Sequence, residues 1–209
     1  FQNGEKNLAV ISCEIIYIPQ NITYEWYSKP INRDNPDPDG YEAHLFIGAG
    51  AAIKREVLEQ VGYYDESFFI FFNENELSTR IIGAGYEIRY FPQIKVYHKT
   101  SSTRFPARTR YFTTRNMIWY YWKYFPFHIA VGRTVIRLPF ECMISVYHGV
   151  SIIQIIKTIF DTIVGMPMVL KNRQPIPAKY VKKALRYENV FQDIYNWIRE
   201  TAKRRKKMK

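Results

Sequence analysis

The sequence predicts an α/β domain followed by an α-helical extension. An apolar, β-branched run at Asn7–Ile18 has the pattern of a buried strand. From Leu45 to His98, strand-like and helix-like patterns then alternate, as they do in α/β proteins. The charge changes sign directly after His98. Residues 1–98 hold 8 Lys/Arg and 14 Asp/Glu, a net charge of −6, whereas residues 99–209 hold 22 and 5, a net charge of +17. This division indicates two regions with different surroundings.

The composition allows a sizeable core. Of the 209 residues, 47% are hydrophobic and 17% are aromatic, which suits one folded domain with an appendage. Cys13 and Cys142 lack metal-ligand spacing and are too sparse for a disulfide framework, so we expect both to be reduced and buried. The chain opens without a methionine or a secretory signal pattern, and we therefore expect it to be a piece of a longer protein.

Turn residues separate the first predicted strand from a glycine-containing one. Asn32–Glu42 combines Pro, Gly and short polar side chains, as turns do. Asp37 and Asp39 form a D-x-D pattern there, but a metal-binding pair of this kind normally ends a hydrophobic strand. We therefore expect no metal at these aspartates. His44–Ile53 is predicted to be a strand whose glycines allow another backbone or a ligand to approach closely.

A short helix and a sharp turn follow this strand. Lys54–Gly62 is amphipathic, and Gly62 is the expected C-terminal stop. The chain then turns at Asp65, and a group of aromatic side chains is expected to anchor the next segment in the core. These are Phe68, Phe69, Phe71 and Phe72.

An acidic cluster opens the next predicted helix. Asn73 is a suitable N-cap, and Glu76, three residues later, can complete a capping box. Glu74 is not needed for the cap, but it lies in the first turn, where the helix dipole stabilises a carboxylate. A solvated first-turn acid is the alternative interpretation of Glu74. Arg80, one turn after Glu76, can form an ion pair with it.

Two short strands complete the acidic region. The preceding helix is expected to end at Gly83 or Gly85. The runs YEIRY and IKVYH alternate as strands do, with a turn expected at Pro92 between them, and the second run stops at His98.

The order of these features resembles the motifs of family-2 nucleotide-sugar glycosyltransferases of the rhamnosyltransferase-like kind. The resemblance covers roughly residues 7–125 and is strongest over 44–98. The residues that carry it are Gly48, Lys54-Arg55-Glu56, Gly62-Tyr63-Tyr64-Asp65-Glu66-Ser67-Phe68-Phe69, Asn73-Glu74-Asn75-Glu76-Leu77-Ser78-Thr79-Arg80, Gly85-Tyr86 and Tyr97-His98.

The resemblance implies the C-terminal half of a GT-A type sandwich, an α/β fold around a mainly parallel sheet. Such enzymes invert the anomeric centre by direct displacement of a nucleoside diphosphate, and a carboxylate deprotonates the acceptor hydroxyl. That role falls by position on Glu74, while Gly48, Asp65 and Glu76 are implied as acceptor-binding. The family's E-D-x-D reads N-E-N-E here. A Glu in the base position carries one extra methylene, for which its pocket must compensate.

Two further ligand groups follow from the resemblance. His98 is implied as a ligand of a divalent metal, Mg²⁺ or Mn²⁺, that neutralises the leaving diphosphate. A surface or capping histidine is the alternative. Arg104 and Arg108, in the basic passage after His98, are candidates for phosphate binding, with a solvated basic loop as the alternative. The donor-binding half of the family is expected upstream of Phe1.

The basic region contains three apolar stretches, at 117–131, 135–150 and 150–170. The longest uncharged run, Cys142–Ile156, is shorter than a confident membrane-spanning helix. The aromatic residues between Trp119 and Phe125 are typical of a membrane interface. We therefore expect amphipathic helices in the headgroup plane or a shallow hairpin, with a packed helical subdomain as the alternative. The basic tail at 202–209 would attract an anionic leaflet.

Together these observations predict two regions. Residues 1–115 are expected to be the acceptor-side half of a catalytic domain, and residues 116–209 a basic, amphipathic, membrane-associated region. The expected partners are a nucleotide-sugar donor, a glycan or lipid-linked acceptor and an anionic membrane surface, at the cytoplasmic face of the cell membrane. The alternative is a non-catalytic basic module that binds membrane or nucleic acid. We expect no nucleic acid, because no recognised nucleic-acid motif is present and the apolar runs are too long for a solvated groove.

Overall fold

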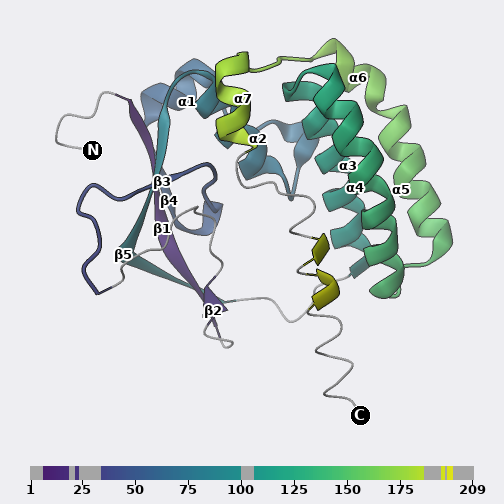
Figure 1. Cartoon of the computed structure of the whole chain (residues 1–209), viewed down its shortest axis with the longest axis horizontal. Coiled ribbons are helices and arrows are strands. Elements are labelled where there is room, and N and C mark those ends of the chain that lie inside the picture. Colours follow the sequence, from purple (N-terminus) through teal and green to yellow (C-terminus); the bar gives the residue numbers. More distant parts are fainter. Residues whose placement is uncertain are drawn as a thin grey trace.

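The computed structural model describes residues 7–18, 22–23, 34–99, 106–185, 194–195 and 197–199. Two features of the sequence analysis, Arg104 and the basic tail at 202–209, lie outside these ranges. A twisted sheet forms one end of the molecule and a group of long helices forms the other, with shorter helices joining them along one side (Figure 1). The predicted α/β class is confirmed.

Two long parallel strands form the centre of the sheet. Strand β1 (Leu8–Ile18) pairs along its length with β5 (Glu87–Lys99). The shorter strands β2 (Ile22–Thr23), β3 (Tyr41–Ala43) and β4 (Ala51–Ile53) are all antiparallel to their neighbours. The order is β2-β1-β5-β3, with β4 on β1, so the sheet is mixed rather than mainly parallel.

Two of the predicted strand boundaries were wrong. The turn expected at Pro92 is a bulge inside the continuous strand β5, where the pairing with β1 jumps from Phe91 to Lys95. Proline cannot donate to the ladder, and a bulge leaves it unpaired without ending the strand. The strand expected over 44–53 is a 3₁₀ turn at Gly48–Gly50 followed by β4 alone.

Two helices cover the sheet. Helix α1 (Arg55–Val61) stops at Gly62, whose φ of 90° is open to glycine, as predicted. Helix α2 (Asn73–Gly83) ends at the first of the two predicted glycines. Leu77 and Ile81 on α2 are fully buried in a core that also contains residues of β1 and β5. A short 3₁₀ turn, η2 (Glu66–Phe68), connects the two helices.

The predicted N-cap at Asn73 was wrong. The N-cap is Phe72, with a left-handed φ of 60° and no side-chain hydrogen bond, and Asn73 is the first helical residue. Phe69 and Phe71 also have positive φ values, of 48° and 62°. Placing three nearby phenylalanines at positive φ costs conformational energy, because L residues with a β-carbon avoid the left-handed backbone region. An interaction from elsewhere must hold this segment.

The remaining helices pack around a second core. They are α3 (Pro106–Tyr124), α4 (Phe127–Tyr147), α5 (Ile152–Val164), α6 (Met166–Lys171) and α7 (Ala178–Ala184). Tyr120, Tyr121 and Phe125 are at most 2% exposed in this core. The aromatic cluster that was interpreted as a membrane interface is therefore interior packing. Helix α3 also runs unbroken through residues 115 and 116, so the two predicted regions share one helix.

Both cysteines of the sequence are free thiols and only partly buried. Burial raises the pKa of each thiol, which keeps both in the unreactive protonated form.

Candidate active site

Glu74 faces Gly48 at the start of α2. A β-carbon placed on Gly48 would lie 3.1 Å from Glu74 Oε1, a tight contact that would require the carboxylate to shift by a few tenths of an ångström. The 3₁₀ turn that interrupts the predicted strand is what brings the Gly48 backbone under the first turn of α2. Two residues selected separately from the sequence thus lie in contact, although 26 positions separate them in the sequence.

Tyr64 completes this group and was not selected from the sequence. Its hydroxyl oxygen lies 3.6 Å from the same β-carbon position on Gly48. Burial and the negative charges of Glu74 and Glu76 raise the pKa of Tyr64 to about 12. The phenol therefore keeps its proton at neutral pH and can donate a hydrogen bond. Nothing in the sequence separates Tyr64 from the adjacent Tyr63, because only the fold shows which ring turns toward Glu74.

Glu76 is occupied in the interior. It is fully buried, and its carboxylate accepts hydrogen bonds from Arg80 Nε at 2.6 Å and Arg80 Nη2 at 2.7 Å, and one from the Tyr124 hydroxyl. The predicted pairing with Arg80 is confirmed, and the capping box is wrong. Direct contact with an acceptor does not fit this geometry, because the carboxylate has neither exposure nor free lone pairs directed outward.

Arg80 also forms hydrogen bonds with the turn that contains Tyr64. Its guanidinium donates to the carbonyl oxygens of Val61 at 2.6 Å, Gly62 at 2.8 Å and Tyr63 at 2.6 Å. Burial alone would lower the pKa of Arg80, but the hydrogen bonds and charge of Glu76 outweigh it and raise the pKa. The Glu76–Arg80 pair therefore fixes the backbone of the turn beside Glu74.

Asp65 holds the other end of the same turn. Its Oδ1 accepts from Ser67 N at 2.9 Å and Ser67 Oγ at 2.6 Å, and its Oδ2 pairs with Lys123 of α3. Burial alone would raise the pKa of Asp65, but the hydrogen bonds from Lys123 and Ser67 lower it below its usual value. The partly buried Asp65 carboxylate is thus committed to holding η2 against α3.

A buried amide explains the three left-handed phenylalanines. Asn116 of α3 is fully buried, and its Nδ2 donates to the carbonyl oxygens of Phe68 at 2.6 Å, Ile70 at 2.9 Å and Phe71 at 2.9 Å. Those carbonyls converge because the intervening backbone is left-handed. Asn116 therefore stabilises the strained approach to α2, on which the position of Glu74 depends.

His98 and Arg108, two of the residues implied for metal and phosphate, each lie against an aromatic ring. His98 stands near the end of β5 with its ring edge-on to Tyr17, at a centroid distance of 5.3 Å. Across the described ranges, no group of three or more His, Cys, Asp or Glu side chains could hold a metal ion. Mg²⁺ and Mn²⁺ prefer several oxygen ligands, so His98 could supply at most one of the ligands of such a metal. Arg108, exposed on α3, lies over the ring of Phe69 at 5.9 Å.

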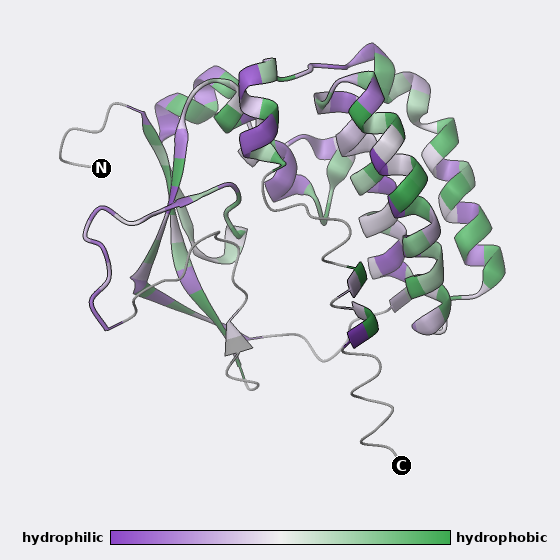
Figure 2. Ribbon diagram, in the orientation of Figure 1, coloured by the Kyte–Doolittle hydropathy of each residue, from purple (hydrophilic) through white to green (hydrophobic). Residues whose placement is uncertain are grey.

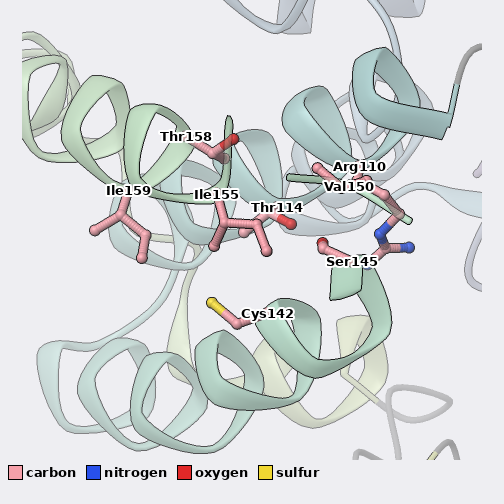
Figure 3. Close-up of a pocket in the computed structure, with 8 residues that line it drawn as sticks. All are labelled: Arg110, Thr114, Cys142, Ser145, Val150, Ile155, Thr158 and Ile159. Atoms are coloured by element: carbon pink, nitrogen blue, oxygen red, sulfur yellow. The ribbon is translucent and has the colours of Figure 1, made fainter. Parts of the chain in front are cut away.

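A separate small pocket lies among α3, α4 and α5 (Figure 3), with room for about one water molecule. Arg110 of α3 lines it and pairs with the buried Glu141 of α4. Burial lowers the pKa of Arg110. This pocket belongs to the interior of the helical part, and none of its lining residues is part of the Glu74 cluster.

No model of a known protein family matches the chain, and no curated protein matches it either.

Proposed function

We propose that this chain is the acceptor-side portion of an inverting, GT-A type glycosyltransferase in which Glu74 is the general base. The observation that carries the proposal is the contrast between the two carboxylates at the start of α2. Glu76 is fully buried and accepts hydrogen bonds from Arg80 and Tyr124. Glu74 is partly exposed, and its side chain forms no hydrogen bond or ion pair with another residue of the described ranges. Of the two, only Glu74 is open to receive a proton.

The surroundings of Glu74 suit this chemistry. Glu74 lies in the first turn of α2, where the helix dipole favours a negative charge. Glu74 Oε1 and the Tyr64 hydroxyl lie on the same side of Gly48. The protonated Tyr64 phenol can donate to an acceptor oxygen bound beside Glu74 and orient it.

The proposed reaction is a single displacement. The acceptor hydroxyl oxygen attacks the anomeric carbon of a nucleotide sugar, and its proton passes to a Glu74 carboxylate oxygen as the new C–O bond forms. The bond from the anomeric carbon to the diphosphate oxygen breaks, and the nucleoside diphosphate leaves with that electron pair. The donor sugar would be bound by the half of the protein upstream of this chain.

Substitution of Glu74 by Gln tests the proposal in a protein that includes the upstream half. We expect transfer of a labelled sugar from a nucleotide sugar to the membrane acceptor fraction to fall about 10²- to 10⁴-fold, because the amide cannot accept the proton. Donor binding, followed by equilibrium dialysis, should stay nearly unchanged.

The matched control is Glu59→Gln. Glu59 is an exposed acid on α1 that forms an ion pair with Arg55 at 2.8 Å. A surface ion pair of this kind contributes little to stability. This variant should transfer sugar like the native protein. Normal turnover in Glu74→Gln would remove Glu74 as the base, and an equal loss in both variants would point to a general effect of charge.

The alternative of a nucleic-acid-binding module has less support. Aromatic rings that stack on bases must be accessible, whereas Trp119, Tyr120 and Tyr121 are at most 6% exposed. The vesicle experiment below includes an oligonucleotide to test this alternative directly.

A further inference from the structure

Helix α5 turns its apolar side toward solvent. Its exposed large side chains fall within about a third of the helix circumference at 3.6 residues per turn, so they form one continuous stripe. Each of them is at least 60% exposed: Ile152, Ile153, Ile156, Phe160, Ile163 and Val164. In an ordinary surface helix this stripe would face the core. Here the amphipathic pattern is inverted.

The opposite side of α5 is small and polar, and it is the side that packs. Thr158 and Thr162 are buried, and their hydroxyls donate to carbonyl oxygens of the same helix, Gln154 at 2.8 Å and Thr158 at 2.7 Å. Trp119 of α3 donates to the Thr162 carbonyl at 3.0 Å. The two threonine bonds leave no hydroxyl unpaired on the packed side, and the Trp119 bond joins α5 to α3, so turning the apolar stripe into the interior would break that bond.

Helix α4 also exposes apolar side chains, although Ala130, Phe140 and Ile144 of the same helix are buried. Arg137 and Glu141 point inward and are at most 8% exposed, whereas a series of apolar side chains on α4 is at least 44% exposed. That series is Phe127, Val131, Val135, Met143 and Val146. Helices α4 and α5 both pack on α3 (Figure 1), and hydrophobic residues are prominent along both in Figure 2. We call these two exposed series together the α4–α5 apolar face.

We propose that the α4–α5 apolar face docks on an anionic lipid bilayer. An exposed apolar surface of this extent marks an interaction site rather than ordinary solvent-facing protein. The charge of the surrounding chain selects the partner: residues 99–209 carry a net charge of +17. Two copies of so basic a region would repel each other across a shared interface, whereas anionic headgroups would attract it.

The helix lies in the plane of the bilayer rather than across it. By length and composition, Ile152–Lys171 is the one stretch of the described chain that could cross a membrane. Lys157 and Asp161 form an ion pair at 2.7 Å near the middle of α5, and Asp161 also accepts from Tyr111 of α3 at 2.8 Å. Crossing the bilayer would place this charged group in hydrocarbon and detach α5 from α3. Lying flat buries the stripe and leaves both contacts intact.

Flotation with vesicles tests the docking surface. The whole chain should bind vesicles of phosphatidylcholine and phosphatidylglycerol, and it should bind pure phosphatidylcholine vesicles more weakly. Ile156→Glu and Phe160→Glu should each reduce partitioning at least about tenfold, because each removes a large apolar side chain from the buried area.

Ile94→Glu is the matched control. Ile94 is 43% exposed on β5, outside the α4–α5 apolar face, so the substitution makes the same change of charge on an exposed isoleucine elsewhere. This variant should bind vesicles like the native chain. Glu74→Gln should also bind normally, so that loss of docking and loss of transfer remain separate results.

Nitroxide labels on cysteines introduced at Ile153 and Ile163, with Cys13 and Cys142 replaced by alanine, test the orientation. An in-plane helix places both labels at the same depth, whereas a spanning helix separates them by about 15 Å at 1.5 Å per residue. Equal depths support the proposal, and a large difference overturns the in-plane orientation.

Three other results would overturn the docking proposal. One is the absence of vesicle binding by the native chain. Another is a native dimer that Ile156→Glu converts to a monomer without any vesicle binding, which would make the face a contact between copies. The last is salt-sensitive binding of a short oligonucleotide with no binding to anionic vesicles at equal salt.

Discussion

At the scale of single residues, the two glutamates in the first turn of α2 have different surroundings. Glu76 is held by Arg80 and Tyr124 in the interior, and Glu74 faces the open position at Gly48. The motif order could predict that a carboxylate in this segment matters. It could not predict which one is free, because that depends on Tyr124, which is 48 residues further along the chain.

Tyr64→Phe should lower kcat/KM for the acceptor about tenfold without changing donor binding. The reason is the loss of one hydrogen bond from a phenol that stays protonated, since burial, Glu74 and Glu76 raise its pKa to about 12. Tyr63→Phe is the control, because Tyr63 accepts its hydrogen bond from Arg80 through the backbone carbonyl, which the substitution leaves in place. If the two variants behave alike in acceptor titrations, the Tyr64 hydroxyl has no role in positioning.

The same raised pKa predicts a change of stability at alkaline pH. The pKa of Tyr64 is higher in the folded state than the ordinary tyrosine value of about 10, so its contribution to stability is fully present below about pH 10 and is lost as the pH rises toward 12. Urea unfolding at pH 9 and pH 11 should show a smaller alkaline loss in Tyr64→Phe than in the native chain. An identical loss in both would contradict the raised pKa.

At the level of secondary-structure elements, local signals in the sequence located most helices but not what holds them. Gly62 marks the end of α1, and the β-branched run from Leu8 marks β1. The bulge at Pro92 was not predictable, since it depends on the register with β1. The exposure of apolar side chains on α4 and α5 was also not predictable, because a periodic pattern shows that a helix has an apolar side but not whether that side faces the interior or the solvent.

Asn116→Ala should destabilise the fold by about 2–4 kcal/mol, because its amide donates to three carbonyl oxygens of the left-handed segment before α2. Asn172→Ala is the control, since Asn172 makes a single exposed hydrogen bond to Met168 at 3.1 Å. Urea unfolding measures both variants. A loss below about 1 kcal/mol in Asn116→Ala would mean that the phenylalanine segment holds its conformation without the amide.

For the whole molecule, the contacts between α2 and α3 connect the sheet part to the helical part. Tyr124 donates to Glu76, and the hydroxyls of Thr79 and Tyr120 share a hydrogen bond of 2.8 Å. Tyr180 of α7 packs against both hydrophobic cores. The Glu74 cluster and the α4–α5 apolar face are thereby attached to one framework, so that docking on a bilayer would also fix the direction in which Glu74 faces.

Tyr124→Phe tests this connection. Removal of a buried hydrogen bond should cost about 1–3 kcal/mol, whereas Tyr86→Phe, which loses an exposed bond to Gln60, should cost less. Because both cores share their contacts, circular dichroism and tryptophan fluorescence should follow one thermal transition, and Tyr124→Phe should lower its midpoint equally by both measures. Two separate transitions would instead mean that the sheet part and the helical part fold independently, with α3 divided near residue 115. In that case the position of Glu74 would not follow the orientation of the apolar face.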